Sequence, residues 1–92
     1  MILEELEELA RSRRGGDTEA SYTARLLADP ELISRKVMEE AFEVCLEFGR
    51  TEVSGERVAS EAADLLYHLL VGLAAVDVPL ADVFTELESR RS

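Results

Sequence analysis

The chain has 92 residues, of which 47% are hydrophobic and 33% are charged, and this balance excludes an intrinsically disordered protein. At this length we expect a single domain over residues 1–92 that buries only a modest share of its surface. Twenty acidic residues against ten Lys and Arg give a net charge of −10, which repels phosphate backbones and argues against a nucleic-acid partner.

The first half of the chain predicts three helices. Residues 2–11 form a short amphipathic helix, and residues 21–28 form a second one. Asp29-Pro30 suits the start of a long helix over residues 30–48, which Gly49 ends. Its apolar side chains cover more than half of its circumference, so one neighbouring helix cannot bury them all. They are Ile33, Val37, Met38, Ala41, Phe42, Val44, Cys45, Leu46 and Phe48.

The second half predicts another long helix, from residue 55 to residue 76. Residues 65–76 are apolar on every side except for His68, so we expect a buried helix that is too short to span a membrane. A last amphipathic helix follows Pro79 over residues 80–90. The residues of this helix that we expect to face inward are Val83, Phe84 and Leu87. The predicted fold is an all-α helical bundle of two long antiparallel helices plus shorter ones, completed by dimerisation.

Two acid pairs lie on the long helices, Glu40/Glu43 and Glu61/Asp64. The Glu-x-x-Glu spacing of the first pair is by itself typical of a solvated helix face. The second pair borders the apolar helix, so we expect it to be desolvated and to need a partner. Carboxylates converging from two helices repel one another, and a bound cation relieves that repulsion. Ligation by oxygen alone favours Mg²⁺, with Mn²⁺ also possible, over zinc.

Other side chains near these acids have two interpretations each. Lys36 forms either an i to i+4 ion pair with Glu40 or a contact to a substrate phosphate. His68 is either a core histidine, hydrogen-bonded within the bundle, or a substrate contact. We expect Tyr67 and Phe48 in the core or at an interface rather than as a base-stacking platform.

The cysteine content and the N-terminus bear on the compartment. Cys45 is the single cysteine, which excludes an intramolecular disulfide and a zinc cluster, and its apolar neighbours predict an inert buried thiol. Residues 1–5 lack the pattern of a signal peptide, and no run of ~18 apolar residues occurs. We expect a soluble cytoplasmic protein without a membrane partner.

Three blocks of the sequence resemble the phosphoribosyl-ATP pyrophosphatase family, within the MazG-like superfamily of α-helical nucleotide pyrophosphohydrolases. The blocks are Ser21-Tyr22-Thr23-Ala24-Arg25-Leu26-Leu27, Lys36-Val37-Met38-Glu39-Glu40-Ala41-Phe42-Glu43 and Glu61-Ala62-Ala63-Asp64-Leu65-Leu66-Tyr67-His68. They occur in the family's order, and the resemblance extends from about residue 2 to residue 90. The last two blocks alone indicate only the superfamily. One departure is Met38, at a position that is often glycine in the family.

The resemblance implies a homodimer that hydrolyses phosphoribosyl-ATP to phosphoribosyl-AMP and pyrophosphate, the second step of L-histidine biosynthesis, with water activated by Mg²⁺. It implies metal ligands at Glu40, Glu43, Glu61 and Asp64, and we expect the carboxylate of Glu39 or Glu43 to accept the proton of the attacking water. It implies substrate contacts from Ser21, Tyr22, Arg25 and Lys36, to which we add His68 because it shares a helix face with Asp64.

The sequence is compatible with two other functions. An enzyme of the same superfamily can act as a house-cleaning pyrophosphohydrolase of non-canonical nucleoside triphosphates, and the substrate that is turned over distinguishes it. A non-catalytic acidic dimerisation module is the alternative from another class. It predicts no stabilisation by Mg²⁺ or Mn²⁺.

Overall fold

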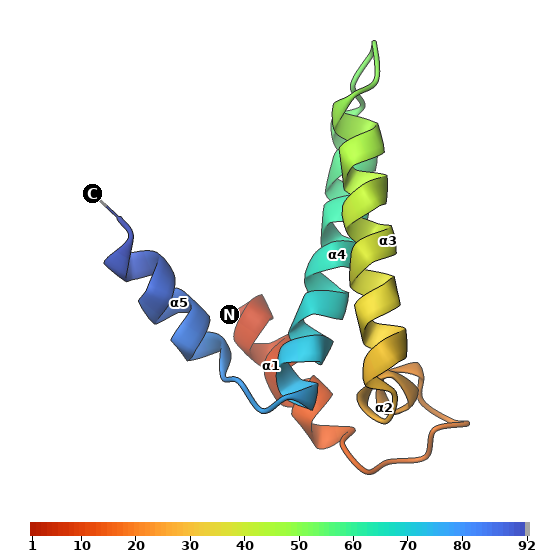
Figure 1. Ribbon diagram of the computed structural model, residues 1–92, viewed down its shortest axis with the longest axis vertical. Coiled ribbons are helices and arrows are strands. Elements are labelled where there is room, and N and C mark those ends of the chain that lie inside the picture. The colour runs from red at the N-terminus through yellow and green to blue at the C-terminus, as the bar shows by residue number, and fades with distance from the viewer. Residues whose placement is uncertain (92) are drawn as a thin grey trace.

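The computed structural model describes residues 1–91, and within them it has five helices and no strand (Figure 1). The helices are α1 (Ile2–Ser12), α2 (Tyr22–Leu27), α3 (Pro30–Phe48), α4 (Gly55–Ala75) and α5 (Leu80–Ser89). The predicted all-α fold is confirmed, and each predicted helix begins and ends within about two residues of the observed one.

Side-chain caps explain why three of the helices start where they do. Ser21, Asp29 and Ser54 each accept a hydrogen bond from the backbone N–H three residues further on, at the starts of α2, α3 and α4. Pro30 occupies the first turn of α3, as predicted. Gly49 follows α3 with φ −88°, so the helix ends at the predicted glycine without using the left-handed conformation.

The antiparallel pair α3 and α4 forms the long axis of the molecule, and the two helices lie side by side (Figure 1). Helix α1 packs on α4, and the short helix α2 packs on both α3 and α4. Helix α3 approaches α4 closely at Gly72, where a Cβ atom would lie 3.0 Å from Cγ2 of Ile33. The buried cluster at this end of the pair comprises Ala10, Leu26, Ile33, Val71 and Ala74.

Helix α5 projects away from the other helices and has no extensive contact with any of them among residues 1–91 (Figure 1). Phe84 and Leu87 are exposed and Val83 is only half-buried, so the prediction that they face inward is wrong for the single chain. The physical reason lies at the turn before α5. Asp77 adopts φ 59° and accepts a hydrogen bond of 3.0 Å from Arg11, and this turn directs α5 outward.

The predicted burial of α4 is also only half right. One side of the helix is covered by α1, α2 and α3, and its buried residues are His68, Leu70, Val71 and Ala74. The other side is open, and Leu66, Leu69 and the following Val76 are exposed. Cys45 on α3 is exposed too, which contradicts the predicted buried thiol. Periodicity identified the apolar sides correctly, but a single chain does not have enough helices to cover them.

Helix α4 is long and apolar enough to cross a membrane by length and composition, and no other helix of the described chain is. The central helix of a helical bundle meets the same criterion. Because α4 contacts α1, α2 and α3, it has that central position here.

Candidate metal centre

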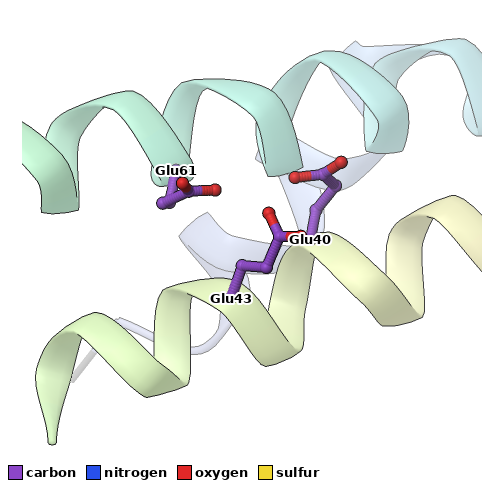
Figure 2. Close-up of side chains that lie close together, drawn as sticks. All are labelled: Glu40, Glu43 and Glu61. Carbon is purple, nitrogen blue, oxygen red and sulfur yellow. The ribbon is translucent and has the colours of Figure 1, made fainter.

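Three glutamates from the two long helices converge between them (Figure 2). Glu40 and Glu43 are one turn apart on α3, and Glu61 faces them from α4. One carboxylate oxygen of each lies within 4.8 Å of the other two. Glu43 is directed from α3 toward α4, and Glu40 and Glu61 reach into the same space. We call Glu40, Glu43 and Glu61 the carboxylate cluster.

The burial of this cluster suits a divalent cation. Glu40 is only 8% exposed, Glu61 is half-buried and Glu43 is exposed, so the cluster opens to solvent on the side of Glu43. Within residues 1–91, the Oε2 atoms of Glu40 and Glu61 are buried without a hydrogen-bond partner. Leaving such oxygens unpaired costs free energy, and a hard cation with oxygen ligands removes that cost. The donor set therefore fits Mg²⁺ or Mn²⁺.

The electrostatics of the cluster support the same conclusion. Burial, followed by the nearby charges of Glu43 and Asp64, raises the pKa of Glu40 above its ordinary value. A hydrogen bond shared with Glu43 is the main cause that raises the pKa of Glu61, and partial burial and neighbouring acids add to it. Without a cation, the charged forms of these acids are unfavourable in the folded chain.

The raised pKa of Glu40 predicts that Glu40→Gln is more stable than the metal-free wild type at neutral pH. Between the ordinary pKa and the raised pKa, the folded wild type binds more protons than the unfolded chain, so its stability falls as pH rises through that interval. Gln is uncharged and avoids this loss. We expect a gain of about 1 kcal/mol, or roughly 4–8 °C in Tm.

Thermal unfolding with a chelator present, from pH 4 to pH 8, measures this difference. It should be near zero at the acidic end and grow with pH. Glu52→Gln, at an exposed loop position, should show no such trend. A Glu40→Gln protein that is less stable than wild type at pH 8 contradicts the account.

The remaining predicted acids and Lys36 lie beside the cluster. Asp64 is exposed and outside the cluster, but it is one turn from Glu61 on α4, and its charge raises the pKa of both Glu40 and Glu61. Its role as a metal ligand stays a prediction. Lys36 pairs with Glu39, with 3.3 Å between Nζ and Oε2. The predicted ion pair of Lys36 with Glu40 is therefore replaced by one at i to i+3.

The predicted substrate residues at α2 lie where this helix packs on α3 and α4. The hydroxyl of Tyr22 is 2.9 Å from Nε2 of His68, and the Arg25 guanidinium lies 5.3 Å from the centre of the Tyr22 ring. The hydroxyl of Ser21 caps α2. His68 is 7% exposed, which favours the first of its two interpretations, a core histidine. Direct substrate contacts by Ser21, Tyr22 and Arg25 stay predictions.

The expected order of burial among the acids was wrong. Glu61 and Asp64 were expected to be desolvated, yet Asp64 is exposed and the most buried acid of the cluster is Glu40. The reason is that Glu40 lies in the buried stripe of α3, as does Glu47 seven residues later, which is paired with Arg50 at 3.0 Å. The seven-residue spacing of Ile33, Glu40 and Glu47 is the sequence signal of this stripe.

A helical bundle with carboxylates projecting from two facing helices is an all-α fold whose arrangement of acids can hold a divalent cation. Comparison with known proteins identifies the family, because the family described as phosphoribosyl-ATP pyrophosphohydrolase matches residues 2–91. The chain belongs to this family.

Curated relatives agree with this assignment. A phosphoribosyl-ATP pyrophosphatase from Cereibacter sphaeroides is 51% identical, in an alignment that covers 97% of this chain and 85% of the relative. Proteins of the same name from Dinoroseobacter shibae and Caulobacter are 50% and 45% identical, each over 97% of this chain and over 86% and 81% of the relative.

Proposed function

We propose that this protein hydrolyses phosphoribosyl-ATP to phosphoribosyl-AMP and pyrophosphate, the second step of L-histidine biosynthesis, in the cytoplasm. Its family membership supports the substrate, because relatives that share about half of its residues carry the name phosphoribosyl-ATP pyrophosphatase. The observation that carries the proposal is the carboxylate cluster with its two unpartnered buried oxygens. A hydrolase of a polyphosphate needs such a site to neutralise negative charge in a chain whose own net charge is −10.

Glu40, Glu43 and Glu61, with Asp64 one turn along, are the residues that would hold Mg²⁺ or Mn²⁺, which supplies a Lewis acid for the leaving pyrophosphate and for the attacking water. In the reaction, the water oxygen bonds to a phosphorus of the α–β bridge, the bridging P–O bond breaks, and pyrophosphate leaves. Glu43 borders both other carboxylates and is our first candidate to accept the proton of water.

The other groups of the site bind and orient the substrate. Glu39 is the alternative proton acceptor, and its exposed carboxylate is paired with Lys36. Lys36 and Arg25 supply positive charge for phosphates beside the acids. Ser21 and Tyr22 lie at the start of α2, where the substrate's ribose or phosphates would approach.

Release of pyrophosphate from purified protein tests the proposal, with phosphoribosyl-ATP and dUTP as competing substrates in the presence of Mg²⁺. Turnover of phosphoribosyl-ATP with little turnover of dUTP is the expected result. The opposite preference favours the house-cleaning pyrophosphohydrolase of non-canonical nucleoside triphosphates.

A homodimer is the second part of the proposal. Large apolar side chains are exposed on α3 and α4, among them Met38 at 72%, Phe42 at 63% and Leu69 at 44%. An apolar groove between the two helices, bordered by Met38 and Val76, connects their exposed surfaces. Soluble monomers rarely expose apolar surface of this extent, whereas a second copy of the chain would cover it.

Phe42→Glu should therefore weaken self-association. A charge placed at the centre of an apolar interface is expected to cost at least about 2 kcal/mol of association free energy. Sedimentation velocity should show dimers for wild type and for the conservative Phe42→Leu, and monomers for Phe42→Glu at micromolar concentration. If all three proteins sediment as dimers, the face of α3 that carries Phe42 is not part of the interface.

A further inference from the structure

The short helix α2 is held against α4 by two neighbouring residues. Tyr22 contacts His68, with 2.9 Å between the hydroxyl and Nε2, and Thr23 bonds the hydroxyl of Tyr67. A helix of six residues is not stable alone, so tertiary contacts must set its position. The side chains of α4 therefore determine where α2 lies relative to the carboxylate cluster.

The hydrogen bonds of His68 fix which ring nitrogen carries the proton. Nδ1 lies 2.8 Å from the backbone carbonyl oxygen of Asp64. A carbonyl oxygen only accepts hydrogen bonds, so Nδ1 carries a hydrogen, and in the neutral ring Nε2 is the acceptor. The Tyr22 hydroxyl then donates to Nε2. Both nitrogens of this buried ring are engaged within the chain, so neither is left for the substrate.

Tyr22 is within electrostatic range of basic and acidic side chains. Burial raises its pKa, so the phenol keeps its proton and stays a donor at neutral pH. Lys36 and Arg25 both lie close enough to oppose that shift, and the charge of Glu40 adds to it. The ring stacks near Tyr67 with centroids 6.4 Å apart.

Arg25 lies against the same Tyr22 ring, with its guanidinium carbon 5.3 Å from the ring centre. This contact is a cation–π interaction, which restricts where the guanidinium can lie. The position of the ring therefore restricts the position of the Arg25 cation.

We propose that His68 is a positioning residue for substrate binding: it holds the Tyr22 hydroxyl, and the Tyr22 ring holds the Arg25 guanidinium for a phosphate group of the substrate. This inference rests on the proposed function. It differs from a direct substrate contact by His68, because His68 acts only through Tyr22. It also differs from a metal role, because the carboxylate cluster does not include His68.

Steady-state kinetics of the full chain with phosphoribosyl-ATP and Mg²⁺ test it. Tyr22→Phe removes the hydroxyl alone, and His68→Leu removes both ring nitrogens while suiting the apolar surroundings of α4. Each should raise KM about tenfold, the value of one hydrogen bond, with kcat within about threefold of wild type. The double variant should be no worse than either single variant, because both break one connection. His68→Gln, which keeps an amide that can accept from Tyr22, should recover part of the loss.

The matched control is Tyr67→Phe, which breaks the neighbouring bond between the same two helices. It should lower Tm as much as Tyr22→Phe and leave KM unchanged. A KM raised equally by Tyr67→Phe overturns the inference, since the effect is then general loosening of α2. A His68→Leu protein that loses kcat and the stabilisation by Mn²⁺ also overturns it, as do additive effects in the double variant.

These outcomes separate the inference from the function on which it rests. A wild-type chain that does not turn over phosphoribosyl-ATP removes the proposed function itself. If the wild type is active and neither Tyr22→Phe nor His68→Leu changes KM, the positioning role alone is refuted.

Discussion

Glu61→Gln should lower the rate of pyrophosphate release from phosphoribosyl-ATP by about a thousandfold or more, equivalent to roughly 4 kcal/mol of transition-state stabilisation. Glu61 is the member of the carboxylate cluster that α4 contributes, and its Oε2 atom is buried without a partner within residues 1–91. The amide has the same shape but lacks the charge that would hold a divalent cation. The loss should therefore come from the chemistry and not from the fold.

Glu56→Gln on the same helix is the matched control. Glu56 is exposed and lies more than one turn away, so this variant should retain the wild-type rate. Circular dichroism should show equal helix content in both variants. Asp64→Asn tests whether the cluster extends to a fourth carboxylate, and we expect a loss similar to that of Glu61→Gln. Full activity in Glu61→Gln refutes the assignment of the site.

The helices of this protein were predictable because their signals are local. Asp29 and Pro30 at the start of α3 and Ser54 at the start of α4 act within a few residues of themselves, and the structure has both caps. The facing of the acids across the two long helices was predictable as well, since an antiparallel pair with apolar inner faces brings Glu40 and Glu61 together.

The sequence does not predict which apolar helix faces are buried within a single chain. Periodicity marks Cys45, Phe84 and Leu87 as apolar positions, but their exposure depends on how many helices pack around them and where the turn at Asp77 sends α5. For the same reason, the expected burial of Asp64 and the observed burial of Glu40 differ. Asp64 borders an apolar helix and is nevertheless exposed, whereas Glu40 lies in a covered stripe.

Contacts between residues distant in the sequence could not be predicted for another reason. Tyr22 and His68 are 46 residues apart, and their bond depends on the angle at which α2 crosses α4. Each residue taken alone had an ordinary interpretation. Only the structure shows the series of contacts that runs from the Asp64 carbonyl through His68 and Tyr22 to Arg25.

Mg²⁺ or Mn²⁺ should raise the Tm of the wild-type protein, and a chelator should abolish its activity. The carboxylate cluster is destabilised by its own charges without a cation, as the raised pKa values of Glu40 and Glu61 indicate. An ion that binds only the folded chain stabilises it by about 2.7 kcal/mol at a concentration of 100 Kd, which is roughly 10–20 °C in Tm for a chain of this size.

The control for this shift must account for the net charge of −10, since any salt screens repulsion among the twenty acids. NaCl at equal ionic strength should therefore give only a small shift in Tm. Glu40→Gln should lose most of the specific shift although its metal-free form is more stable than wild type. That opposite pair of effects is the decisive result, because a solvated acidic face in a non-catalytic dimerisation module predicts neither of them. A wild-type shift no larger in Mg²⁺ than in NaCl contradicts the metal site and with it the proposed hydrolysis.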